Sequence, residues 1–158
     1  MKKKLKPLEY AFWLLELRDR SIGEMEEKFR RKEFDQQEIA ETMKFLIDKK
    51  FLDDEKFAAN FVRFKKSVKP VGKYYLQQKL TAKKISKEII GKVLSDTPDE
   101  IEEISELADR WLMKHCGPRP KADQPMAEKE KIYQKLTRHL LSRGFEWEKV
   151  REVIAEKL

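Results

Sequence analysis

The sequence predicts an all-α protein built from three tandem three-helix repeats. Of its 158 residues, 41% are charged and 40% hydrophobic, and only 5 glycines and 6 prolines are present to interrupt helices. Leu, Lys and Glu are abundant while β-branched residues rarely stand together, which is typical of helical proteins. A recurring sequence pattern and well-marked helix starts support the same fold class.

The recurring pattern is a basic turn that joins apolar residues spaced five positions apart. Its copies contain Phe29, Phe34 and Ile39, then Leu80, Ile85 and Ile90, and finally Leu140, Phe145 and Val150. Repetition of this kind indicates a serial array of similar modules, each too small to bury a core without its neighbours. Such arrays usually offer a long surface to an extended partner rather than a pocket to a small molecule.

Helix starts are marked by capping residues. Ser21 and Asp35 each precede a glutamate by three positions, the spacing of a capping box. Asp53 starts a further helix with two acids behind it, and Pro98 stands where a first helical residue is expected. The predicted helices lie near 7–20, 22–33 and 36–50, near 54–67, 72–83 and 87–95, and near 98–115, 126–143 and 147–157.

These helices divide the chain into three predicted domains. Repeat one covers residues 1–51, the basic repeat two covers 52–96, and repeat three covers 97–158. A proline-rich internal loop at 117–125 interrupts repeat three and is expected to be mobile.

Several classes of protein are excluded by what the sequence lacks. The longest apolar run, 11–15, is too short to cross a bilayer, so no membrane association is expected. Lysines open the chain as in a signal peptide, but Glu9 and the charged stretch 16–20 interrupt any apolar segment, so nothing marks it for secretion. Cys116 is the only cysteine, which excludes an internal disulfide and favours the reducing cytoplasm.

Catalytic and metal-binding patterns are also missing. One cysteine with His115 and His139, and no clustered carboxylates, does not form a structural zinc site. There is no glycine-rich phosphate loop and no histidine–carboxylate pair beside a nucleophile. Asp53 and Asp54 are adjacent acids, but their position before a helix favours capping. We therefore expect no enzyme activity, no cofactor and no metal.

Basic residues are concentrated in the middle of the chain. Residues 63–92 contain ten Lys or Arg and one acid, whereas residues 99–109 are acidic. This segregation steers polyanions toward one region, and we predict contact with nucleic acid or an acidic protein surface rather than a merely solvated face. The predicted contact residues are Arg63, Lys65, Lys66, Lys69, Lys73, Lys79, Lys83 and Lys84. Of these, Lys65, Lys66, Lys73, Lys79 and Lys83 are expected to be largely exposed to solvent.

Aromatic residues are predicted to serve mainly as core. Phe57, Phe61 and Phe64 fall on one helix face, and we expect Phe57 and Phe61 to be buried. Three other aromatic residues could stack on nucleic-acid bases: Tyr74, Tyr75 and Trp111. Their helical spacing favours a core role for them as well.

The segment 51–62, Phe-Leu-Asp-Asp-Glu-Lys-Phe-Ala-Ala-Asn-Phe-Val, resembles the hallmark of the RecX family, regulators of the bacterial recombinase RecA. Gly72 and the segment 76–85 resemble the family's leucine–lysine–glycine turn. Arg143 to Phe145 resemble its closing arginine–glycine–aromatic turn, and the segment 11–29 resembles its opening helix pair. The motif residues with implied structural roles are Leu52, Asp53, Asp54, Phe57, Ala58, Phe61, Gly72, Leu80, Arg143, Gly144 and Phe145.

The resemblance covers nearly the whole chain and implies an elongated, curved array of three three-helix repeats. It implies a cytoplasmic regulator of recombination, DNA repair and the SOS response. Such a protein binds along the groove of the RecA nucleoprotein filament, inhibits ATP hydrolysis and strand exchange, and promotes loss of the filament. We further expect a monomer that binds single- or double-stranded DNA weakly when RecA is absent.

Two departures from the family pattern carry physical consequences. The glycine of the first two turns is replaced by Glu33 and Lys84, and only Gly144 remains. Those turns must reach their conformation without glycine's freedom at positive φ. The usual arginine-rich stretch after the hallmark is mostly lysine, which acts on phosphates as a point charge rather than a bidentate donor.

Two alternative functions stay open at this point. The first is a stand-alone nucleic-acid-binding protein of helix-turn-helix type, although the candidate recognition helices near 36–50 and 87–95 lack a base-reading array of Arg, Asn or Gln. The second is a helical adaptor between two proteins. The salt dependence of binding to plain single-stranded DNA, compared with binding to the recombinase filament, separates the three possibilities.

Overall fold

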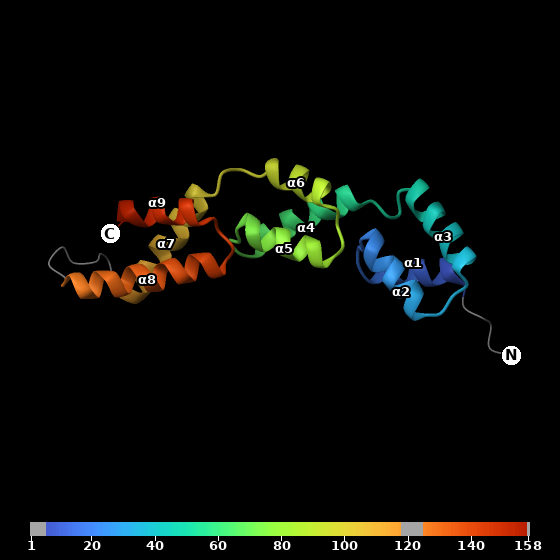
Figure 1. Cartoon of the computed structure of the whole chain (residues 1–158), viewed down its shortest axis with the longest axis horizontal. Coiled ribbons are helices and arrows are strands. Elements are labelled where there is room, and N and C mark those ends of the chain that lie inside the picture. The colour runs from blue at the N-terminus through green and yellow to red at the C-terminus, as the bar shows by residue number, and fades with distance from the viewer. Residues whose placement is uncertain (1–5, 118–124, 158) are drawn as a thin grey trace. The chain divides into compact units, whose positions relative to one another are not determined.

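The computed structural model describes residues 6–117 and 125–157, and every regular element in these ranges is an α-helix (Figure 1). The bounds of the helices are α1 Pro7–Leu17, α2 Ile22–Arg31, α3 Gln36–Asp48, α4 Asp54–Val68, α5 Lys73–Ala82, α6 Lys87–Ser95, α7 Ile101–Cys116, α8 Met126–Ser142 and α9 Trp147–Lys157. Each predicted helix is present, with ends that shift by a few residues. None of the described helices is both long and apolar enough to cross a membrane.

The predicted capping residues start three of these helices. The Ser21 hydroxyl accepts from the Glu24 amide at 3.1 Å, and the Glu24 carboxylate accepts from the Ser21 amide at 3.3 Å, which completes a capping box. Asp35 accepts from the amide of Gln37 at 2.9 Å, and Asp53 accepts from the amide of Lys56 at 3.1 Å. Local sequence therefore determines where these helices begin.

The predicted start of α7 at Pro98 is wrong, because the helix begins at Ile101. The carboxylate of Asp99 accepts from the Ile101 amide at 3.3 Å. The carboxylate of Glu100 does not cap its own helix but accepts from the Lys73 amide at 2.7 Å. A contact with a residue far away in the sequence thus accompanies the later start.

The recurring pattern builds the core of each repeat. Its nine apolar positions are buried, except for Phe34, which is half-buried. Phe34 still packs on the Tyr10 and Phe29 rings, with centroid distances of 5.9 and 6.0 Å. The periodic spacing therefore identified core positions in all three repeats.

The turn within each copy passes through the left-handed backbone region. The φ angles are 55° at Glu33, 63° at Lys84 and 81° at Gly144. The predicted positive φ without glycine is therefore present in the first two turns. This conformation destabilises a residue with a Cβ by about 1 kcal/mol, whereas Gly144 has no Cβ and adopts it without this steric cost.

Gly72 and Gly144 bring two backbone segments into direct contact. The Gly72 amide donates to the carbonyl of Arg143 at 2.9 Å, and the Tyr74 amide donates to the carbonyl of Gly144 at 3.0 Å. A Cβ at Gly72 would overlap the Gly144 carbonyl group, and a Cβ at Gly144 would overlap the Tyr75 backbone. This junction can form only where neither residue has a side chain.

The chain forms two compact units, and we describe each by itself. The first comprises residues 1–62 and 79–93, and the second comprises residues 63–78 and 94–158. The buried core of the first unit includes Tyr10, Ala11, Leu14, Met25, Phe29, Ile39, Met43, Leu46 and Leu52. The largest cluster of the second includes Ile104, Leu107, Ala108, Leu112, Ile132, Leu136, Leu140, Phe145, Val150, Val153 and Ile154.

The predicted apolar face of α4 is only partly buried. Phe57 is 8% exposed and Phe61 is half-buried, whereas Phe64 is 62% exposed. The expectation of burial is therefore confirmed for Phe57 and wrong for Phe61.

Of the proline-rich loop predicted at 117–125, residues 118–124 lie outside the described residues, and Gly117 has a φ of 79° after the end of α7.

Candidate partner-binding surface

Five of the predicted contact cations belong to the second unit. Arg63 and Lys69 are exposed, whereas Lys65, Lys66 and Lys73 are half-buried. The expectation that the last three are largely exposed is therefore wrong. The reason is clearest for Lys66, whose Nζ lies 3.0 Å from the carboxylate of Glu103 on α7. With 19% and 29% of their side chains exposed, these two residues tie α4 to α7 within the unit.

Lys73 lies beside a buried carboxylate. Glu100 is fully buried, and its Oε1 accepts the backbone N–H of Lys73 at the start of α5. Burial raises the pKa of Glu100, and the hydrogen bond from Lys73 opposes this shift only partly. Its Oε2 is buried without a hydrogen-bond partner among the described groups. Lys73 thus contributes its backbone to a structural contact.

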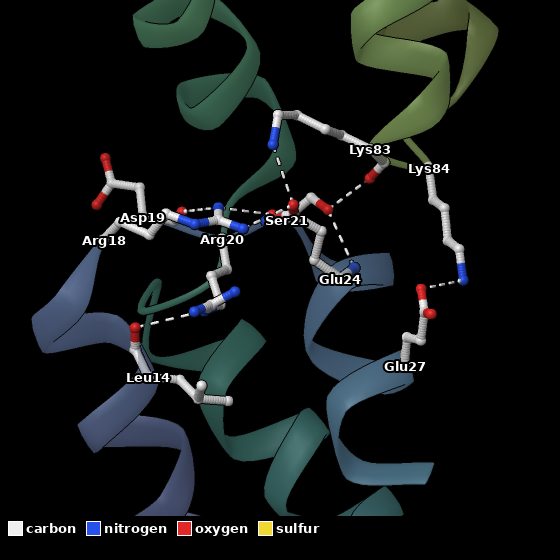
Figure 2. Close-up of polar contacts among 9 residues, drawn as sticks. All are labelled: Leu14, Arg18, Asp19, Arg20, Ser21, Glu24, Glu27, Lys83 and Lys84. Carbon is white, nitrogen blue, oxygen red and sulfur yellow. Dashed lines mark hydrogen bonds and ion pairs between the residues drawn. The ribbon is translucent and has the colours of Figure 1, made fainter. Parts of the chain in front are cut away.

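Three of the predicted cations belong to the first unit, and two of them pair with acids on α2 (Figure 2). Lys83 Nζ lies 3.0 Å from Glu24 Oε1, and Lys84 Nζ lies 3.1 Å from Glu27 Oε2. Ser21 also donates its hydroxyl to the carbonyl of Lys83. Lys79 is exposed. The predicted exposure is therefore confirmed for Lys79 and wrong for Lys83, which is half-buried.

Glu24 is the centre of this cluster. Both nitrogens of the Arg18 fork donate to its carboxylate, at 3.0 and 3.1 Å, in the bidentate geometry that favours arginine. Burial alone would raise the pKa of Glu24, but hydrogen bonds from Arg18 and Lys83 outweigh it and lower the pKa to about 2. Glu24 is thus a charged residue held by two cations and its own cap.

Lys83 also lies over two aromatic rings of α4. Its Nζ is 5.5 Å from the Phe57 centroid and 5.6 Å from the Phe61 centroid. A cation at this distance from a ring face is attracted by the ring's quadrupole. Lys83 therefore binds an acid and two phenylalanines of its own chain, which leaves little of it for a partner.

The paired acids of the hallmark segment have structural contacts. Asp53 caps α4, while the carboxylate of Asp54 accepts from the backbone amide of Ile22 at the start of α2, at 2.9 Å. Burial raises the pKa of Asp54. Leu52 and Ala58 beside them are buried. These contacts explain two adjacent acids without a catalytic role.

Sequence reasoning missed an exposed apolar pair among the cations of α4. Phe64 and Val68 are 62% and 64% exposed and lie one helical turn apart. Lys65 Nζ lies 6.0 Å from the Phe64 centroid, and Arg63 and Lys69 are exposed nearby in sequence. The flanking lysines and arginine were the only sequence signal that this end of the helix is not covered. We call Arg63, Phe64, Val68 and Lys69 the α4 surface.

The remaining aromatic candidates divide between core and surface. Trp111 is half-buried against the core of the second unit and stacks on His115 at 4.3 Å, in agreement with its predicted core role. Tyr75 is half-buried, but Tyr74 is 61% exposed, so the predicted core role of Tyr74 is wrong.

Within the described residues, no group of three or more His, Cys, Asp or Glu side chains could hold a metal ion.

These features define a class of protein: an all-helical chain of three repeats. Some of its lysines form ion pairs within the fold, and others are exposed on the surface. Models of the first, second and third three-helix domains of RecX match residues 8–46, 53–94 and 101–154. The chain therefore belongs to the RecX family.

Relatives agree with this membership, and a solved structure agrees with the fold. The regulatory protein RecX of Prosthecochloris aestuarii is 31% identical over 153 residues, which cover 97% of this chain and 94% of that protein. The regulatory protein RecX of Chlorobium phaeobacteroides is 32% identical, with coverage of 94% and 91%. The crystal structure of RecX from Lactobacillus salivarius has a TM-score of 0.82 at 22% identity, over 96% of this chain and 94% of that chain, and is similar in fold.

Proposed function

We propose that this protein regulates RecA-mediated recombination by binding the RecA–DNA filament and inhibiting its ATP hydrolysis and strand exchange. The family membership supports a regulatory role, because the relatives are named regulatory proteins. The observation that carries the filament contact is the α4 surface, where exposed cations flank exposed apolar side chains. A filament presents both phosphates and protein, which this combination of groups fits.

The α4 surface has the groups that such a contact needs. The Arg63 guanidinium can bind a phosphate or carboxylate through two parallel hydrogen bonds, and Lys69 adds a point charge. Phe64 and Val68 supply apolar area that a partner can remove from water, and a phenyl ring can also stack on an unpaired base. Charge alone would bind any polyanion, so the apolar pair supports preference for a composite partner.

The contact set is smaller than the eight cations that we predicted from sequence. Lys66 and Lys83 are largely buried ion-pair partners, and using them would break contacts of the fold. Lys84 is different, because 47% of its side chain is exposed and its pair with Glu27 is a surface pair. Such pairs are worth about 0–1 kcal/mol, so a phosphate could displace Glu27 at little cost. We assign filament contact to the four predicted cations that are exposed, Arg63, Lys69, Lys79 and Lys84.

The test is a direct comparison of two ligands over a series of salt concentrations. Binding of the protein to RecA filament on single-stranded DNA is measured beside binding to the same DNA without RecA, together with the rate of DNA-dependent ATP hydrolysis. We expect tighter binding to the filament and a lower hydrolysis rate. An unchanged rate with binding confirmed would exclude inhibition, and equal affinity for bare DNA would favour a stand-alone nucleic-acid-binding protein.

We also propose that the protein acts in the cytoplasm and catalyses no reaction of its own. The Asp53–Asp54 pair has structural partners, and the relatives are named regulators. Purified protein should show no ATPase or nuclease activity. Turnover that disappears in a point variant of this chain would overturn the proposal.

A further inference from the structure

The second unit contains an open groove of about 530 Å³ that the proposed function does not use. Its walls come from the first part of α5, the end of α8 and the start of α9. The lining side chains that matter for its chemistry are Tyr74, Gln78, Leu141, Glu146, Trp147 and Glu148. The groove is distinct from the α4 surface, none of whose residues line it.

The walls of the groove are joined by the backbone junction of Gly72 and Gly144. The amides of Gly72 and Tyr74 donate to the carbonyls of Arg143 and Gly144, and the two glycines allow the segments to touch. Tyr74 on one wall belongs to this junction, and Trp147 on the other wall is the third residue after Gly144. The groove is therefore preformed, which lowers the entropic cost of binding a ligand.

The groove combines exposed aromatic rings with carboxylates. Tyr74 is 61% exposed and Trp147 is 44% exposed, and Leu141 adds a partly exposed apolar side chain. Among the described residues, Glu146 and Glu148 are the only charged ones that line the groove, although the whole chain has a net charge of +7. Glu146 lies 3.6 Å from Lys149, whereas Glu148 is exposed and makes no ion pair with another described residue.

We infer that this groove binds an arginine side chain from an apolar segment of a partner protein. Aromatic faces attract a cation, and a guanidinium can stack flat on a ring while its fork binds a carboxylate. Leu141 would contact the apolar neighbours of that arginine. Nucleic acid fits poorly, because the two carboxylates repel phosphates and no lysine or arginine of the described ranges lines the groove.

This inference goes beyond the proposed function, because it concerns a second surface. The charge of the groove is opposite to that of the α4 surface. The α4 surface is suited to phosphates or acids, whereas the groove is suited to a cation. Loss of one should leave the other intact, so the two proposals can fail independently.

The experiment uses the full chain and a defined probe, the acetylated and amidated peptide leucine–arginine–leucine. Its matched control is the same peptide with citrulline, which keeps the shape of arginine but not its charge. Binding is followed by NMR through the indole N–H of Trp147, which is identified by its loss in Trp147→Phe. We expect saturable shifts with the arginine peptide and little shift with the citrulline peptide.

Variants test the carboxylate. Glu148→Gln should weaken binding of the arginine peptide about fivefold. Glu152→Gln, which removes an exposed acid from the same helix outside the groove, should leave it unchanged. Equal shifts with both peptides, no shift up to the solubility limit, or larger shifts with a short thymidine oligonucleotide would each overturn the inference. Unchanged melting of Glu148→Gln rules out an effect through folding.

Discussion

Lys83 and Lys69 lie in the same basic stretch of sequence but have different roles in the structure. Lys83 is half-buried, 3.0 Å from Glu24 and over the rings of Phe57 and Phe61. Lys69 is exposed beyond the end of α4, near the exposed apolar pair of Phe64 and Val68. Density of charge in the sequence therefore does not distinguish a lysine that holds the fold from one that faces solvent.

The same contrast appears along a single helix face. Phe57 and Phe64 share the apolar face of α4, yet one is 8% exposed and the other 62%. Stability experiments should separate the buried end of the helix from the exposed end. Binding experiments should show the reverse order of effects.

The largest expected effect is that of Phe57→Ala, which should lower the free energy of unfolding by about 3–4 kcal/mol because it empties a buried site. Phe64→Ala should change it by no more than about 0.5 kcal/mol. Urea or thermal unfolding measures both. Phe64→Ala should instead weaken binding to the RecA filament. Equal destabilisation by the two variants would show that the exposed end is also covered.

Glu24→Gln should cost about 2 kcal/mol of stability at neutral pH, because it weakens charged hydrogen bonds to Arg18 and Lys83. The pKa of Glu24 lies at about 2 in the fold, below its ordinary 4.5. Its stabilisation is therefore complete above about pH 4.5 and is lost as the pH falls through about 2. The control Glu26→Gln, on an exposed position of α2, should shift stability by less than about 0.5 kcal/mol.

Reversing the charge of the α4 surface should affect binding and not folding. The double variant Arg63→Glu with Lys69→Glu should lower filament affinity about tenfold or more at low salt, and less at high salt. Lys83→Glu should mainly lower the melting temperature. The opposite reversal, Glu102→Lys with Glu106→Lys on α7, serves as the charge control and should leave binding intact or improve it. Equal losses from both double variants would contradict a role for this charge.

The smallest expected effect is that of Glu100→Gln, within about 1 kcal/mol and opposite in sign to Glu24→Gln. Burial raises the pKa of Glu100 above its ordinary 4.5, so ionisation disfavours the folded state. Its contribution to stability should fall as the pH rises from about 4.5 to that raised pKa. The glutamine keeps an oxygen for the Lys73 amide and removes this dependence. A loss at neutral pH as large as that of Glu24→Gln would contradict the sign.

The sequence by itself determined the helices, the capped starts of α2, α3 and α4, and the core positions of the repeats. Ser21, Asp35 and Asp53 act on amides only two or three residues away, so their effect is readable locally. The apolar residues of the recurring pattern, from Phe29 to Val150, could also be recognised from sequence, because each copy repeats the same spacing across its turn. The left-handed turns at Glu33 and Lys84 could be predicted because the family pattern has glycine at these positions, as this chain has at Gly144.

Only the tertiary structure decided which of the predicted contact residues are exposed and which are half-buried. The acids that hold Lys66 and Lys83 lie 37 and 59 residues away along the chain, and no local pattern links them. The burial of Glu100, which accompanies the late start of α7, and the exposure of Phe64 and Tyr74 likewise depend on how distant segments pack. A helix face has the same sequence pattern whether or not another segment covers it, so burial is set by packing rather than by periodicity.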